Sequence, residues 1–345
     1  MMKRSLQHIK SAARLLPLAF LLSAGTAAAE TLTLYCSAED EQCQIMASGF
    51  TKATGIDVAM TRKSTGEVLA QLLAEVSNPK GDVWWGGTGD PHVQAAEQSL
   101  TEPYQSPMLT ELQPWAVRQA EQTGYRTIGV YANALGLIYN KEVIAAKKMP
   151  PPACWADLIR PEYKDEIQMP NPVSSGTAYT ALATLIQLLG EEPAFEYLKQ
   201  LDSNISQYTK SGSAPTTAAS RGESAIGIGF MALGVIQVLN GFPVEVVAPC
   251  EGTGYEIGSM SLIKGGPSPE TARKFYDWAL TAKAQELGAE AKSFQAPSNL
   301  EAKLPPEAPD LSKVKLIDYD FKKYGSSEER KRILSRWESE VGSKK

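Results

Sequence analysis

The sequence predicts an α/β protein with two lobes, each built on a mainly parallel sheet with flanking helices. Short apolar runs alternate with helical segments over residues 32–98, and this alternation is typical of βαβ units with parallel strands. The same alternation starts again near residue 127. A chain of 345 residues, 43% of them hydrophobic, is long enough to build a core in each of two lobes.

The first set of elements is expected to form one lobe. Strands are predicted at Leu32–Tyr35, Ile56–Met60 and Asp82–Trp85, and helices at Asp40–Thr54, behind Ser64 and at Pro91–Gln98. Gly55 is placed to end the first helix, and Ser64 with Glu67 has the spacing of a capping box at the start of the second. Asp90 is the predicted cap of the third helix.

The second set has its own strands, helix and caps, which predicts a second lobe. Extended segments are predicted at Thr127–Tyr139, Ile167–Met169, Ala225–Phe230 and Val244–Ala248, and a long helix opens within Ser174–Thr177 and ends at Gly190. A strand at Met260–Ile263 and a helix at Pro269–Ala282 follow. The charged segment Glu328–Val341 is expected to form a C-terminal helix.

Residues 1–29 are interpreted as a secretory signal peptide. The basic residues Lys3, Arg4, Lys10 and Arg14 precede the apolar run Leu15–Leu22, and small residues stand before Glu30. No later stretch approaches the ~20 apolar residues that a membrane-spanning helix needs. We therefore expect a mature chain that begins at or near Glu30 and resides in the periplasm.

The charge of the mature chain argues against nucleic acid as a partner. Four of the 34 basic residues lie in the signal, which leaves 30 against 39 acidic residues and a net charge of −9. An acidic surface disfavours both nucleic acid and anionic membranes. It does not exclude a small anionic ligand, because a site can be locally positive within an acidic protein.

The four cysteines are expected to form disulfides, since an exported chain folds where disulfides persist. Pairing of Cys36 with Cys43 and of Cys154 with Cys250 is favoured, although three connectivities fit the sequence. A metal site is not indicated, because no C-x-x-C occurs and His92 is the only histidine beyond the signal.

The sequence does not indicate an enzyme. Neither G-x-S-x-G nor H-E-x-x-H occurs, and His92 has no evident nucleophile partner in the sequence. We therefore expect a binding protein that uses no cofactor.

Five sequence blocks resemble those of one protein family. They are residues 81–92, 161–164, 171–177, 221–227 and 248–256. In order and over nearly the whole mature chain, the sequence is similar to the type II periplasmic binding proteins grouped with ferric-iron, aminoethylphosphonate, sugar-phosphate and thiamine receptors. The resemblance implies a monomeric receptor that closes by hinge motion on a small molecule and serves an inner-membrane ABC permease. A receptor that feeds a membrane sensor kinase would share this fold.

The same resemblance implies where each lobe begins and ends. Residues 30–129 and 255–300 would form the first lobe, residues 130–254 the second, and residues 301–345 a C-terminal tail and helix packed outside. Two crossover strands near residues 130–133 and 252–256 would join the lobes, with the ligand bound in the cleft between them.

Small polar residues follow several predicted strands, at the edge where α/β sheets bind ligands. The candidate ligand-binding residues at these turns are Ser37, Ser64, Thr65, Gly66, Gly87, Thr88, Ser174, Ser175, Gly176 and Thr177. Free N–H groups and the positive end of a helix dipole favour an anion there. The alternative is helix capping by these hydroxyls, above all at Ser64, where Glu67 completes a capping box. The positive charges of Arg62 and Lys63 precede that turn.

Ferric iron is the main alternative ligand. The resemblance implies adjacent tyrosines soon after the block at residues 221–227, but this chain has Phe230 and Met231 there, followed by Ala232 and Leu233. The second lobe is therefore expected to offer an apolar surface that includes Phe230 and Met231. A compact phosphonate, an organophosphate or a carboxylate fits such a cleft better than iron or a neutral sugar.

Three further features have two interpretations each. Trp84 and Trp85 are adjacent in a strand, so one side chain is expected in the core and the other is a candidate for lining the cleft. His92 is expected at the surface or behind the site. Glu256 follows the second crossover, where it either packs at the hinge or reaches an amine on the ligand.

Overall fold

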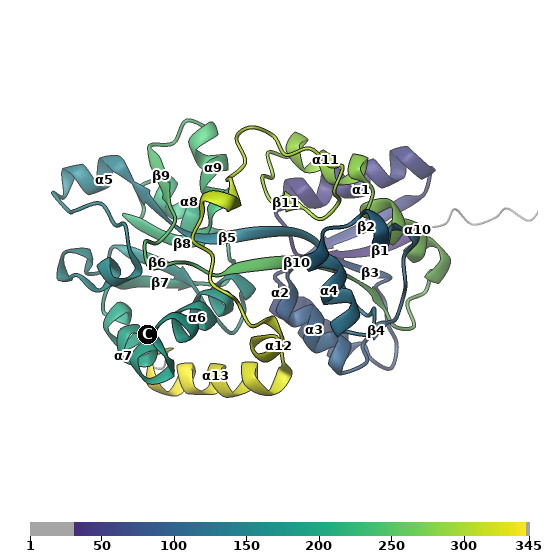
Figure 1. Cartoon of the computed structure of the whole chain (residues 1–345), viewed down its shortest axis with the longest axis horizontal. Coiled ribbons are helices and arrows are strands. Elements are labelled where there is room, and N and C mark those ends of the chain that lie inside the picture. The colour runs from purple at the N-terminus through teal and green to yellow at the C-terminus, as the bar shows by residue number, and fades with distance from the viewer. Residues whose placement is uncertain (1–30, 343–345) are drawn as a thin grey trace, which may run out of the picture.

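The computed structural model describes residues 31–342, so the predicted signal and the start at Glu30 lie outside the described residues. Two lobes lie side by side along the long axis of the molecule, and two long strands, β5 (Ile128–Asn140) and β10 (Tyr255–Ile263), run between them (Figure 1). The strand order is β2-β1-β3-β10-β5-β8-β6-β7. The chain is thus an α/β protein with two lobes, as predicted.

The first lobe is built around three parallel strands. β1 (Thr31–Cys36) lies between β2 (Asp57–Arg62) and β3 (Val83–Thr88). The helices of this lobe include α1 (Asp40–Thr54), α2 (Thr65–Ala74), α3 (Gly89–Glu97), α4 (Pro114–Gln122), α10 (Pro269–Ala279) and α11 (Ala282–Glu290). Leu34 of β1 and Phe50 of α1 are fully buried in its core. Gly55 ends α1 in the left-handed conformation, with φ 76°, which a residue without Cβ adopts at little cost.

The second lobe repeats this arrangement. β6 (Ile167–Pro170) pairs in parallel with β7 (Ile205–Thr209) and with β8 (Ile226–Phe230). The helices around it are α5 (Lys141–Ala146), α6 (Gly176–Leu189), α7 (Glu191–Asp202), α8 (Ala214–Ser220) and α9 (Met231–Leu239), and β9 (Val244–Val247) pairs with β5. The remaining elements are β4 (Thr101–Glu102), β11 (Ala296–Pro297) and short 3-10 helices at Pro107–Glu111, Trp155–Ile159, Pro161–Tyr163 and Leu311–Lys313.

The crossover strands belong to both halves of the sheet. β5 pairs with β10 as far as Ala134 and with β8 from Leu135 onward, and all 13 of its residues are buried. These two strands are antiparallel to their neighbours, whereas the other long strands of each lobe are parallel. We keep the lobe boundaries, residues 30–129 with 255–300 and residues 130–254, as a proposal.

The C-terminal tail is part of the second lobe's core. It contains α12 (Phe321–Tyr324) and α13 (Ser327–Glu340), and the side chains of Ile333 and Trp337 are buried among core residues of the second lobe. The start of α13 also reaches the first lobe, because Glu97 of α3 accepts hydrogen bonds from the Ser327 N–H at 2.9 Å and from its hydroxyl at 2.7 Å. The tail therefore contacts both lobes.

One prediction about a helix start is wrong. The third helix begins at Gly89 with Thr88 as its N-cap, so Asp90 is not a cap but a buried carboxyl inside the first turn. Burial raises the pKa of Asp90 to about 7, despite the charge of Arg330 nearby. The predicted helix Pro269–Ala282 is α10, which starts at Pro269 but ends at Ala279, because Thr281 accepts a hydrogen bond from the Ala284 N–H and starts α11 there.

The favoured disulfide pairing is confirmed. Cys36 is bonded to Cys43, and Cys154 to Cys250, so the chain has no free thiol. Within residues 31–342, no helix has both the length and the apolar character needed to cross a membrane.

Candidate functional site

A cavity of about 60 Å³ lies between the two lobes, against the crossover strands. We call it the interlobe cavity. Nine of the predicted ligand-binding residues line it: Ser37, Ser64, Thr65, Gly87, Thr88, Ser175, Gly176, Thr177 and Phe230. The other three, Gly66, Ser174 and Met231, do not line it. The Ser174 hydroxyl instead donates to the carbonyl oxygen of Lys210 at 3.1 Å.

Six helices begin at the interlobe cavity. The N-cap residue of each helix lines it: Glu39 of α1, Ser64 of α2, Thr88 of α3, Ser175 of α6, Ser213 of α8 and Phe230 of α9. The first turn of a helix carries N–H groups without a helical partner, and the helix dipole is positive at this end. Both properties favour negative charge in the cavity.

The hydroxyls at three of these helix starts do not cap their own helices. Thr88, Ser175 and Ser213 form no capping hydrogen bond. At helices away from the cavity, Asn140 and Thr281 do cap, which shows that the chain uses side-chain caps elsewhere. Ser64 forms the predicted capping box with Glu67. Capping therefore accounts for Ser64, but not for the hydroxyls of Thr88 and Ser175. The Thr88 Oγ1 lies 3.4 Å from the Thr65 Oγ1, so one of these two hydroxyls donates to the other and the second keeps a hydrogen for a ligand.

The two lobes touch each other at the edge of the cavity. A Cβ atom added at Gly176 of the second lobe would lie 1.8 Å from the Thr88 Oγ1 of the first lobe. A Cβ atom at Gly66 would lie 3.1 Å from the carbonyl oxygens of Val173 and Ser174. Glycine at these positions lets α2 and α3 approach α6 closely, and the structure is accordingly a closed form of the cleft.

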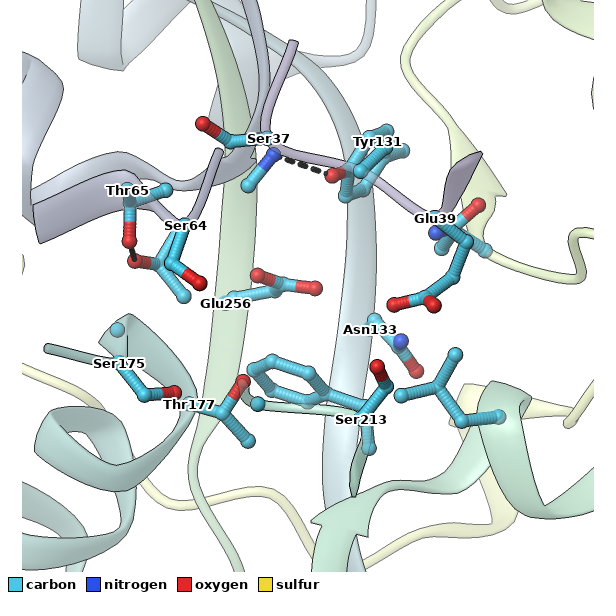
Figure 2. Close-up of a pocket in the computed structure, with 18 of the residues that line it drawn as sticks. Ser37, Glu39, Ser64, Thr65, Tyr131, Asn133, Ser175, Thr177, Ser213 and Glu256 are labelled. Carbon is cyan, nitrogen blue, oxygen red and sulfur yellow. Dashed lines mark hydrogen bonds between the residues drawn. The ribbon is translucent and has the colours of Figure 1, made fainter. Parts of the chain in front are cut away.

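The crossover strands supply a second wall that the sequence analysis mostly missed. Tyr131 and Asn133 of β5 and Glu256 of β10 line the cavity (Figure 2). The Tyr131 hydroxyl accepts a hydrogen bond from the Gly87 N–H at 2.7 Å, which leaves its own hydrogen free to donate. Burial raises the pKa of Tyr131 well above its usual value, so the hydroxyl stays neutral. The sequence analysis had singled out Glu256; for the β5 residues of this wall, the sequence signal is a polar Asn133 amid a mostly apolar strand.

Neither of the adjacent tryptophans lines the cavity, so that interpretation is wrong. Both faces of β3 are covered, and Trp84 and Trp85 are buried on opposite sides of it. Trp84 still acts on the site indirectly, because its Nε1 donates to the Ser37 Oγ at 2.9 Å. With one lone pair engaged in this way, the Ser37 hydroxyl is left to donate its hydrogen into the cavity.

His92 supports this arrangement from behind. Its ring stacks on Trp84 at a centroid distance of 3.6 Å, and its nitrogens contact the Ser261 hydroxyl and the Gly86 carbonyl oxygen. Burial lowers the pKa of His92 to about 3, so the ring is neutral. His92 thus lies behind the site rather than in it.

Comparison with known proteins agrees with this geometry. The family model described as "Bacterial extracellular solute-binding protein" matches residues 88–323. The chain belongs to this family. The periplasmic binding protein AfuA from Actinobacillus pleuropneumoniae, whose structure has exogenous fructose-6-phosphate bound, superposes with a TM-score of 0.89 at 43% identity, over 91% of this chain and 99% of AfuA.

Two further relatives have been found by sequence. An uncharacterised protein of Haemophilus influenzae is 42% identical over 329 residues, which cover 93% of this chain and 95% of that protein. A periplasmic protein of Salmonella typhimurium named for 2-aminoethylphosphonate binding is 26% identical over 280 residues, 77% of this chain and 78% of its own length. This solute-binding protein is accordingly a periplasmic, non-enzymatic component of an ABC importer that binds a small molecule.

One ion pair of this solute-binding protein crosses between the lobes. Lys210 Nζ of the second lobe lies 2.6 Å from Glu67 Oε1 of α2, and this hydrogen bond lowers the pKa of Glu67. Lys210 is exposed, so the pair is screened by solvent. We expect Lys210→Met to weaken ligand affinity by less than about fivefold, because exposed ion pairs contribute little.

Titration calorimetry at low salt and at about 1 M salt measures this effect, which should disappear at the higher concentration. Lys80→Met removes an exposed charge of the first lobe outside the cavity and serves as the control. A loss that is the same at both salt concentrations would contradict the assignment of Lys210 to an electrostatic contact between lobes.

Proposed function

We propose that this protein captures a compact organic phosphate or phosphonate in the interlobe cavity and delivers it to an ABC permease. One observation carries the proposal: hydroxyl-bearing helix starts from both lobes meet at a single cavity, and Thr88 and Ser175 are not engaged in capping. The fructose-6-phosphate bound to AfuA and the phosphonate in the name of the Salmonella protein support the same class of ligand.

The number of donors favours phosphorus over carboxylate as the anionic group. Hydroxyl-bearing residues line the cavity on both sides: Ser37, Thr65 and Thr88 in the first lobe, and Ser175 and Thr177 in the second. Thr65 and Thr88 contact each other, so together they offer one hydrogen, and the five residues offer four. A tetrahedral phosphate or phosphonate has three terminal oxygens that can accept from both sides at once. A planar carboxylate has two, so it would leave more of these donors without a partner.

The iron alternative receives less support. Tyr131 is the only tyrosine among the lining residues, and its hydroxyl already accepts from the Gly87 N–H. The second lobe offers Phe230 where a phenolate set would be needed. It also offers Ser213, which the sequence analysis did not identify, so this wall is more polar than predicted.

The partner of the loaded receptor is also part of the proposal. We expect the ligand-bound form to stimulate ATP hydrolysis by the cognate permease reconstituted in membranes. Stimulation of a membrane sensor kinase instead would assign the same receptor to signalling.

Substitution of two threonines tests the site. Thr65→Val and Thr177→Val keep the side-chain volume and remove one donor from each lobe, so each should cost roughly 1–3 kcal/mol of binding free energy, as expected for a hydrogen bond to a charged group. Calorimetry on protein freed of copurified ligand measures the loss. Thr61→Val, on the exposed side of β2, is the matched control.

Two outcomes would contradict the proposal. If both variants fold and bind like the wild type, the anion is not held at these helix starts. If no phosphate or phosphonate binds while neutral sugars or Fe(III) bind at micromolar concentration, the ligand class is wrong.

A further inference from the structure

The interlobe cavity has two chemically different ends. Figure 2 shows Ser64, Thr65, Ser175 and Thr177 on one side, Glu39, Asn133 and Ser213 on the other, and the Glu256 carboxyl group between them. The first side carries hydroxyls and helix starts, which donate hydrogen bonds to an anion. The other side carries the Glu39 carboxyl group, and with Glu256 next to it this part of the cavity is acidic. A ligand that fills both ends must therefore have two different ends itself.

Glu256 is the most deeply buried of these acidic groups. It lies in β10, directly opposite Asn133 of β5, and only 5% of it is exposed. The charged groups that act on it are Asp90 and Glu39, both acidic, and with burial they raise its pKa well above the usual value.

No cation of the protein balances Glu256. Among the lining residues Arg62 is the only lysine or arginine, its Nε donates to the Ala38 carbonyl oxygen at 3.1 Å, and its charge acts on Glu39. The neighbouring Asn133 Nδ2 is buried and has no hydrogen-bond partner among the described residues. A buried carboxyl group and a buried amide without full pairing are costly unless a ligand completes them.

We infer that Glu256 determines the specificity of this site: it accepts a hydrogen bond from the end of the ligand opposite the phosphorus group, and it excludes ligands with a second anionic end. The inference rests on the proposed function. A hydroxyl or an ammonium group satisfies the Glu256 oxygens, whereas a carboxylate or a second phosphate would bring a further acidic group against Glu256 and Glu39, where each ionised group disfavours the ionisation of the others. Asn133 Nδ2 is placed to donate to an oxygen of the same end of the ligand.

A series of ligands with one phosphonate head tests the inference on the wild-type protein. Ethylphosphonate, 2-hydroxyethylphosphonate, 2-aminoethylphosphonate and phosphonoacetate differ only in the second end, which is apolar, a hydroxyl, an ammonium or a carboxylate. We expect the hydroxyl or the ammonium compound to bind about tenfold or more tightly than ethylphosphonate, and phosphonoacetate to bind more weakly than ethylphosphonate.

The same experiment distinguishes the two kinds of donor. An ammonium group requires ionised Glu256, so its binding releases a proton, and the calorimetric heat then depends on the ionisation enthalpy of the buffer. The phosphonate head can exchange a proton on binding in both compounds, so the hydroxyl compound is the reference, and we expect the ammonium compound to release more protons than the hydroxyl compound after correction for the ionisation of each free phosphonate. Asp90, Glu39 and Tyr131 are the other titratable groups that face Glu256. Both titrations use the wild-type protein, so these groups are present in each and the comparison changes only the ligand.

The variant Glu256→Gln assigns the selectivity to this residue. In this variant we expect the hydroxyl or ammonium compound to bind less than about threefold more tightly than ethylphosphonate. We also expect phosphonoacetate to bind more tightly than it binds to the wild type. Glu245→Gln, at an exposed position of β9, makes the same chemical change outside the cavity and should preserve the wild-type series. Thermal unfolding without ligand verifies that each variant is folded.

The outcomes separate the two proposals. Equal affinity for all four compounds, or an unchanged series in folded Glu256→Gln, would overturn the inference and leave the proposed function standing. Failure of every phosphonate and phosphate ester to bind would overturn the proposed function, and the inference with it. If Glu256→Gln does not fold, the wild-type series alone decides.

Discussion

Replacing Gly176 by alanine is expected to abolish high-affinity binding while the protein stays folded. The added Cβ atom would lie 1.8 Å from the Thr88 Oγ1 and 2.8 Å from the Thr88 Cβ, so rotation of the Thr88 side chain does not remove the overlap. Gly176 and Thr88 belong to different lobes, and the overlap therefore exists only when the cleft is closed. We expect a loss of affinity on the order of 100-fold, since closure is the conformational change that completes the site.

Solution scattering and calorimetry together measure this effect. The wild-type radius of gyration should decrease when ligand is added, and the Gly176→Ala protein should keep the larger, open value. Gly288→Ala in α11 is the matched control, because a Cβ atom there has no contact closer than 3.5 Å. A Gly176→Ala protein that compacts and binds like the wild type would show that α3 and α6 do not meet in this way in the bound state.

Removal of the Cys154–Cys250 disulfide is expected to have the largest effect on stability. The bond joins residues 96 apart in sequence. A cross-link that closes so long a loop restricts the unfolded chain, so its loss in Cys154→Ala/Cys250→Ala should lower the free energy of unfolding by about 2–5 kcal/mol. Neither cysteine lines the interlobe cavity, and affinity at low temperature should therefore change little.

Urea denaturation of the oxidised wild type and the double variant measures the difference. The wild type treated with reductant provides an independent comparison. Identical unfolding midpoints in all three samples would contradict a stabilising role for the bond. Two or more titratable thiols in the folded wild type would contradict the pairing itself.

Local signals in the sequence were sufficient to predict much of the first lobe. α1 spans Asp40–Thr54 as predicted, because its apolar stripe and the left-handed Gly55 act within a few residues of each other. The capping box of Ser64 and Glu67 likewise marks the start of α2. The start of α3 was predicted wrongly, because it depends on tertiary packing. Asp90 is a residue type that commonly caps helices, but here it lies in the first turn of α3 and is buried near Arg330 of the C-terminal tail.

The candidate site was predictable only in part, for a similar reason. Small polar residues after strands identify the helix starts, and Thr65 and Ser175 do meet at one cavity. Tyr131 and Asn133 lie in a strand whose pattern resembles a buried core, and their exposure to the cavity depends on pairing with β10, which is distant in sequence. The positions of Trp84 and Trp85 could not be distinguished, because helices cover both faces of β3.

The Cys36–Cys43 bond has a consequence for the life of the newly made chain. It closes a ring of few residues that contains Ser37 and Glu39, both of which line the interlobe cavity. Reduction of this bond opens the ring, so one rim of the cavity is no longer held in place. We therefore expect the receptor to be complete only where the bond can form and persist, which is an oxidising compartment.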